Sequence, residues 1–211
     1  MASNPKTLAM TPIGTLCFAD TLFVAKPAAD GGKPRFSVIL GFDDTAMKTT
    51  QYQDLRSAVV AAATDKFGAV KAADPAFMRS IRLPFRNASE KEYSGFENFT
   101  VYINPWSPGD KKAPGVVDIN GQDITVPGDV WSGQLGRATV RAFAYDNSGN
   151  KGVSFALEHV QIVKADMPRI DGRRSAAKAF ESVDNSQLAA LGITPGQAPS
   201  SGGIAPDDMP F

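Results

Sequence analysis

The stretch from Arg137 to Val163 constrains the fold more strongly than any other part of this 211-residue chain. Up to Asp146 it alternates strictly, with small apolar residues at every second position. In a strand, the residues between them share one face: Arg137, Thr139, Arg141, Phe143 and Tyr145. The Asp-Asn-Ser-Gly-Asn run that follows is typical of a turn, because such residues tolerate positive φ or bond to their own backbone. A second alternation from Lys151 completes the pattern of a long β-hairpin.

The face expected to point away from the small apolar residues carries cations and flat rings. Cations neutralise phosphates and rings stack on bases, so this chemistry suits an unpaired nucleic-acid strand. The same pattern also arises when arginines lie on a solvated face and the aromatic residues belong to a core. From this stretch alone both interpretations stay open.

Charge and composition describe an ordinary globular chain. Hydrophobic residues make up 43% and charged residues 21%, which fits one domain with appendages. The formal net charge is zero, so no overall basic field indicates a nucleic-acid partner. Beyond Ala165, however, six acidic residues accompany four basic ones, which leaves a surplus of two positive charges before it. This distribution is consistent with a mildly basic body and an acidic tail.

Cys17 is the only cysteine, which excludes an intramolecular disulfide and a cysteine-based zinc site. The first residues lack the layout of a signal peptide, and no apolar run approaches the length that spans a membrane. We therefore expect a soluble protein of the cytoplasm.

The remaining elements are expected to be short strands around one helix. Alternating residues predict strands or extended segments at 13–19, 35–42, 77–85, 99–103, 116–119 and 122–126. A three- and four-residue period predicts an amphipathic helix from Thr50 to Phe67. Thr50 and Gln53 form a capping-box pattern, Asp44 is a rival cap, and Gly68 ends the helix.

This inventory lacks βαβ alternation and favours a mainly β fold, an OB-like antiparallel barrel with one central helix. A β-sandwich carrying one helix is the alternative. Asn120-Gly121 predicts the turn of a second hairpin. We expect a flexible leader at 1–10, one domain at 11–182 that ends in a short helix at 175–182, and a flexible acidic tail at 183–211. From Thr194 the tail is rich in Pro, Gly, Ser and Gln, a composition that cannot bury enough surface to order itself.

Motifs that carry catalysis are missing from the sequence. It contains no phosphate loop, dinucleotide fingerprint or zinc motif. His159 is the only histidine and follows the alternation of a strand, where a structural role is expected. The chain is therefore expected to be neither an enzyme nor a protein that needs a cofactor or a metal.

Tyr102 and Trp106 extend the binding chemistry beyond the hairpin. Both lie opposite Phe99, Val101 and Ile103 in an extended segment. A ring outside the core can stack on any base, for about 1–3 kcal/mol.

Cations from distant segments could converge beside these rings in a barrel and follow the phosphates of one strand. The candidates are Arg82, Arg86, Lys111, Lys112, Arg137, Arg141 and Lys151. The candidate stacking rings are Tyr102, Trp106, Phe143 and Tyr145, although Phe143 could instead face the core. In the alternative interpretation Tyr102 packs against a neighbouring strand and the cations are scattered solubility charges.

The chain closes on two acidic and three apolar residues: Asp207, Asp208, Met209, Pro210 and Phe211. A terminal Phe can place its ring in a pocket of a partner whose cation holds the free carboxylate. The aspartates would steer this tip toward a basic surface. The aspartates would also compete with DNA for the site that these rings and cations are expected to form.

Two resemblances give these features a context. The closing residues are similar to the acidic tip of bacterial single-stranded DNA-binding protein, which ends in several aspartates and Ile-Pro-Phe and recruits replication and repair proteins. This chain has only two aspartates there, and Met209 in place of Ile. Thr11 to about Phe180 resembles a family of phage single-stranded DNA-binding proteins with an OB fold. The matching residues are Pro114–Asp118 and Ala144–Phe155, with a weaker match at Gly172–Ser175.

Together these observations predict a protein of phage replication, recombination and repair that binds and protects single-stranded DNA without sequence preference. The resemblance to bacterial single-stranded DNA-binding protein implies that the tip recruits partner proteins. The resemblance to the phage family implies that the protein acts in the cytoplasm of the host cell. Two alternatives stay open: a single-strand annealing or recombination protein, and a β-rich structural virion protein.

Overall fold

The computed structural model describes residues 5–27, 31–170 and 186. The chain divides into two units, Met1–Arg173 and Arg174–Phe211, and the elements below belong to the first. The short helix expected at 175–182 and the flexible tail expected at 183–211 cannot be compared with it, because apart from Ser186 they lie outside the described residues.

Ten strands form one sheet, so the expected mainly β class is confirmed. Their bounds are β1 (Leu8–Met10), β2 (Gly14–Cys17), β3 (Arg35–Ser37), β4 (Ile39–Phe42), β5 (Arg86–Asn87), β6 (Val101–Ile103), β7 (Trp106–Pro108), β8 (Gly115–Val117), β9 (Leu135–Asn147) and β10 (Asn150–Lys164). The strand order is β3-β7-β10-β9-β2-β4-β6-β5, with β1 on β9 and β8 on β10. Within the expected leader at 1–10, Pro5–Thr7 form a 3-10 helix and Leu8–Met10 form β1, which pairs with β9.

The expected antiparallel barrel requires correction. The hydrogen-bonded path begins at β3 and ends at β5, and these two strands do not pair, so the barrel is not closed. β7 and β8 both run parallel to β10, whereas the other strand pairs are antiparallel. The segment 35–42, expected as one strand, is interrupted at Val38, because β3 pairs with β7 while β4 pairs with β2 and β6.

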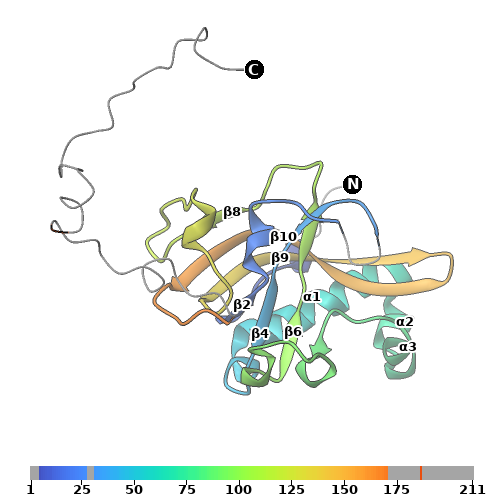
Figure 1. Ribbon diagram of the computed structural model, residues 1–211. Helices are drawn as coiled ribbons and strands as arrows, with labels where there is room; N and C mark the ends of the chain where they lie inside the picture. The colour runs from blue at the N-terminus through green and yellow to red at the C-terminus, as the bar shows by residue number, and fades with distance from the viewer. Residues whose placement is uncertain (1–4, 28–30, 171–185, 187–211) are drawn as a thin grey trace, which may run out of the picture. The chain divides into compact units, whose positions relative to one another are not determined.

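The predicted long hairpin is confirmed. β9 and β10 pair antiparallel from Asn147 opposite Asn150 to Leu135 opposite Lys164. Ser148 (φ 51°) and Gly149 (φ 89°) form the two-residue turn, and such positive angles match the twist of the flanking strands. Figure 1 shows the hairpin, in yellow and orange, running across the molecule with the three helices on one side of it.

Helix α1 (Thr50–Phe67) has the predicted bounds, but its cap differs from the expectation. The backbone of Thr49 is extended and its hydroxyl accepts a hydrogen bond from the Tyr52 amide at 3.3 Å, so Thr49 is the N-cap rather than Thr50 or Asp44. Gly68 ends the helix as expected, with φ 89°. The buried face of α1 packs mainly against β9.

Two short helices that the sequence analysis did not predict follow the central helix α1: α2 (Ala69–Ala73) and α3 (Pro75–Ser80). Asp74 caps α3 by accepting a hydrogen bond from the Ala76 amide at 2.8 Å. The segment 77–85 was expected to be extended, but its first residues are helical because Asp74-Pro75 starts a helix there. Short 3-10 helices complete the described part: η1 (Pro5–Thr7), η2 (Ala19–Leu22), η3 (Ala46–Lys48), η4 (Ala88–Glu90), η5 (Phe96–Asn98) and η6 (Pro127–Asp129).

The second predicted hairpin is only partly formed. Its turn is present, since Asp118 and Gln122 are joined by a backbone hydrogen bond of 2.9 Å and Gly121 has φ 80°. The strand expected after the turn reduces to a single bridge between Val117 and Asp123.

Apolar residues gather on both faces of the sheet. The main core lies between α1 and the face that carries Leu16, Leu40, Ile103 and Val140. A smaller cluster occupies the other face, beneath the chain between β5 and β6: Cys17, Ala88, Phe96, Phe99 and Tyr102. Phe99 therefore lies with Tyr102, not with Ile103 as expected, because its ring fills the space that a side chain at Gly41 would need.

Across the described residues, no helix is both long and apolar enough to cross a membrane.

Candidate nucleic-acid interface

The outer face of the hairpin is the face directed away from the main core. Ala138, Val140 and Ala142 of β9 are buried, so the residues between them point outward, as predicted. In register on the same face, Phe143 lies opposite Ser154 of β10, and Tyr145 lies opposite Gly152.

A pocket of about 310 Å³ opens beside this face, and we call it the Trp106 pocket. Five segments meet there: β3, the chain from Arg82 to β5, the β6–β7 corner, and the end of β9 with the start of β10. Its lining residues are Arg35, Arg82, Leu83, Pro84, Arg86, Tyr102, Asn104, Trp106, Tyr145, Val153 and Ser154. Five of the predicted binding residues are therefore brought together: Arg82, Arg86, Tyr102, Trp106 and Tyr145.

The charged residues that line the Trp106 pocket are all positive. Three of its lining residues are arginines, and none is acidic. Within residues 5–27 and 31–170, none of the three guanidinium groups forms an ion pair: Arg35, Arg82 and Arg86. Since unpaired guanidinium groups around one hollow attract anions, the pocket is suited to phosphate.

Trp106 contacts a ring from β9 and a cation from β3. Trp106 is half-buried and meets Phe143 edge-on, with ring centroids 6.0 Å apart. The guanidinium carbon of Arg35 lies 5.7 Å from the centroid of the Trp106 ring. Phe143 is thus on the outer side of the sheet, next to Trp106, and not in the main core.

Tyr102 lines the pocket but is not an open platform for a base. Only 7% of it is exposed, and its ring packs 5.3 Å from that of Phe96 in the smaller apolar cluster. Burial raises the pKa of its hydroxyl, and nearby Arg86 opposes that rise. Tyr102 does lie on the face opposite Ile103, as predicted, but the covering chain at 88–99 removes it from solvent.

The other predicted cations lie outside the Trp106 pocket. Lys111 and Lys112 are exposed in the loop between β7 and β8. Lys151 pairs with Asp146 at 3.7 Å at the tip of the hairpin. Arg141 is paired with Glu158 at 2.8 Å, on the outer face of the sheet.

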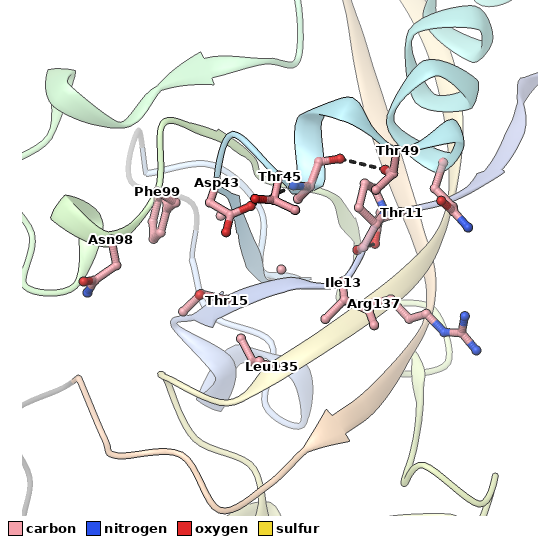
Figure 2. A pocket seen from close by; sticks show the side chains of 15 residues that line it. Thr11, Ile13, Thr15, Asp43, Thr45, Thr49, Asn98, Phe99, Leu135 and Arg137 are labelled. Carbon is pink, nitrogen blue, oxygen red and sulfur yellow. Dashed lines mark hydrogen bonds between the residues drawn. The ribbon is translucent and has the colours of Figure 1, made fainter.

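Arg137 lies at a second pocket, of about 400 Å³, between β2, β4 and the start of α1. Figure 2 shows its side chain at one end of this pocket, away from Asp43 and Asn98. The nearby polar groups already serve the fold, since Asp43 accepts from the Ala46 amide at 2.7 Å and Thr49 donates to the Ala46 carbonyl at 2.6 Å. Arg137 itself donates to Gln161 at 2.8 Å.

Sequence reasoning missed Arg35, which lines the Trp106 pocket. A signal was present, because Arg35 and Ser37 alternate with the buried Phe36 and Val38 and must point away from the core. Asn104 was also missed, and nothing in its sequence context distinguishes it from a loop residue.

The absence of a side chain at Gly152 leaves room for Tyr145 beside the pocket. A Cβ atom at this position would lie 2.5 Å from the Tyr145 hydroxyl and 2.7 Å from the Arg82 carbonyl oxygen. We expect Gly152→Ala to lower the free energy of unfolding by about 1–3 kcal/mol, because the Arg82 carbonyl oxygen belongs to the backbone and cannot move aside freely. Urea denaturation measures this change. Gly128→Ala is the matched control, since a Cβ there meets nothing within 4 Å. Equal stability of the two variants would contradict this account.

Among the described residues, no group of three His, Cys, Asp or Glu side chains is placed to hold a metal ion. Cys17 is buried, which raises the pKa of its thiol to about 12. His159 is exposed and accepts a hydrogen bond from the Gly115 amide at 3.3 Å through Nδ1, a structural role as predicted. The predicted tip, residues 207–211, lies outside the described residues.

Solved structures share this fold. The single-stranded DNA-binding protein from bacteriophage Enc34 in complex with ssDNA is 16% identical, with a TM-score of 0.61 over 78% of this chain and 90% of that one. A second structure of the single-stranded DNA-binding protein from bacteriophage Enc34 gives 16% identity and a TM-score of 0.58, over 84% of this chain and 92% of that one. At such identities the likeness establishes the fold.

A more distant structural likeness is to gp2.5, a single-stranded DNA-binding protein encoded by bacteriophage T7. It is 16% identical, with a TM-score of 0.50 over 92% of this chain and 98% of that one. No curated protein sequence matches the chain. The sequence model of the family described as Enterobacter phage Enc34, ssDNA-binding protein, does match, over residues 15–189. The resemblance to phage single-stranded DNA-binding proteins is thereby confirmed, and the chain belongs to the family of the Enterobacter phage Enc34 single-stranded DNA-binding protein.

Proposed function

We propose that this protein binds single-stranded DNA, without sequence preference, through the Trp106 pocket. The observation that carries the proposal is the meeting of three guanidinium groups, unpaired within the described residues, with the rings of Trp106 and Tyr145 in one hollow. Membership of a family whose namesake is an ssDNA-binding protein supports the same function.

Each part of the pocket has a separate task in this proposal. Arg82 and Arg86 hold phosphates, which are the same for every nucleotide. Trp106 takes a base against its ring, and Arg35 stays beside that ring to meet the adjoining phosphate. Because Trp106 is half-buried between strands, only a base whose face is free can reach it, which favours unpaired DNA over duplex.

The wider role is proposed from the sequence. The protein covers and protects single-stranded DNA during phage replication, recombination and repair in the cytoplasm of the host cell, and catalyses no reaction. Residues 207–211 recruit partner proteins through the ring of Phe211 and the acidic residues before it.

Titration with oligothymidylate, followed by intrinsic tryptophan fluorescence at two salt concentrations, tests the proposal. We expect the fluorescence to be quenched on binding, and the affinity to fall as salt rises, because stacking reaches Trp106 and phosphate contacts release counterions. Double-stranded DNA of the same length is the control and is expected to bind more weakly. No saturable change, as expected of a structural virion protein, or equal affinity for duplex would contradict the proposal.

The annealing alternative shares the pocket and needs a different measurement. An annealing protein would accelerate the pairing of complementary strands, which a mixing experiment with labelled oligonucleotides detects.

A further inference from the structure

One row of residues crosses five strands on the outer face of the sheet. Arg141 of β9 lies opposite Leu8 of β1 on one side and opposite Ala156 of β10 on the other. Ala156 in turn lies opposite Trp106, and Trp106 lies opposite Ser37 of β3. Residues directly opposite one another in neighbouring strands share a face, so Leu8 and Arg141 lie on the same side of the sheet as Trp106.

Strand β1 presents apolar side chains to solvent beside this row. Leu8 is 45% exposed and Met10 is 42% exposed, whereas Ala9 between them is buried against α1. In the described part of the chain β1 pairs with β9 alone, and Met10 lies opposite Thr139. Exposed apolar residues that alternate with a buried one, next to an arginine, form a surface that unpaired bases can cover.

We propose that Leu8 and Met10 extend the DNA site beyond the Trp106 pocket. Bases pack against their side chains, and Arg141 binds the phosphate that links those bases. This inference rests on the proposed function. Two features commit the surface to nucleic acid: the row is continuous with the pocket, and its charged member Arg141 matches a phosphate.

Arg141 already has a partner in the absence of DNA. Glu158 is the extra residue of a β-bulge between Leu157 and His159 of β10, and its carboxylate lies 2.8 Å from the Arg141 guanidinium. The pair is about one-third exposed, and such pairs are weak, so a phosphate can replace the carboxylate at little cost. Glu158 therefore lowers the affinity of this extension for DNA.

The length of the row sets the design of the test. Three strand spacings separate β7 from β1, or about 14 Å. A short oligonucleotide can fill the Trp106 pocket without reaching β1, whereas a longer one must cross it.

The test compares the affinity of oligothymidylates of about two and about twenty nucleotides for the full chain, because about two nucleotides are too short to span this distance. For Leu8→Thr/Met10→Thr we expect the affinity for the long oligonucleotide to fall roughly three- to tenfold and that for the short one to stay unchanged. Threonine keeps the preference for a strand and removes most of the apolar contact. Val60→Thr is the matched control, since Val60 is 47% exposed on α1, which packs on the other face of the sheet.

Glu158→Gln provides a variant that removes no apolar surface. Freed from its partner, Arg141 is expected to raise the affinity for the long oligonucleotide about two- to fivefold at low salt, with the short one unchanged.

Three outcomes would overturn the extension. The first is an unchanged affinity of Leu8→Thr/Met10→Thr for the long oligonucleotide, and the second is an equal change in affinity for both lengths. The third is that Leu8→Thr/Met10→Thr without DNA sediments differently from the unaltered protein without DNA, which would assign this face to contacts between copies of the chain. If the unaltered protein bound neither oligonucleotide, the proposed function itself would fail, which is a distinct result.

Discussion

Replacing Trp106 by alanine is expected to weaken binding to oligothymidylate by roughly tenfold to a hundredfold, and to remove most of the fluorescence change. The half-buried ring lines the Trp106 pocket together with three arginines, so its loss removes the stacking surface while leaving the charge. Fluorescence anisotropy of a labelled oligonucleotide measures the affinity independently of tryptophan emission.

Two controls separate stacking from damage to the fold. Trp106→Phe keeps a flat ring next to Phe143 and Arg35, and is expected to retain most of the affinity. Trp131→Phe should leave the quenching intact, since Trp131 donates to the Met167 carbonyl and packs under Arg169, away from the Trp106 pocket lining. Unchanged affinity in Trp106→Ala would show that the base is held elsewhere.

The combined change Arg35→Gln/Arg82→Gln/Arg86→Gln is expected to have the second large effect. Log affinity falls with log salt, and each phosphate contact to a single strand contributes about 0.7 to the steepness of that fall. Removing three contacts therefore makes the slope shallower by about 2. The affinity at low salt falls with it, because these three groups carry the positive charge of the pocket. Binding isotherms at several salt concentrations give the slope.

Lys111→Gln/Lys112→Gln removes two positive charges from the exposed loop between β7 and β8. Because these lysines do not line the pocket, this variant is expected to keep nearly the original slope. If it lowered the slope as much as the arginine changes do, the DNA path would run over that loop rather than through the Trp106 pocket.

The elements that follow a local pattern could be predicted from the sequence. The hairpin of β9 and β10 follows from strict alternation around an Asn/Ser/Gly turn, and α1 follows from its period and from Gly68. The missed elements depend on weaker local signals. Asp74-Pro75 starts α3 within a segment that otherwise looks extended, and Thr49 caps α1 one residue before the pattern that we recognised.

The candidate site was predictable only in part, because a residue's face and its exposure are different properties. Alternation put Tyr102 on the face opposite Ile103, and the structure agrees. Alternation contains no information about Phe96, which comes from a separate segment and covers the Tyr102 ring. In the same way, the charge of Arg141 is visible in the sequence, but its ion pair with Glu158 of the neighbouring strand is not.

By itself the sequence determined the mainly β class, the long hairpin, the main helix and the kinds of side chain on each face, because these depend on residues close together in the chain. The tertiary structure alone decided that the barrel stays open, and which rings and cations meet around Trp106. The reason is physical: β3, β5, β7, β9 and β10 come together through pairings between distant segments, and a local period carries no record of its partner strand.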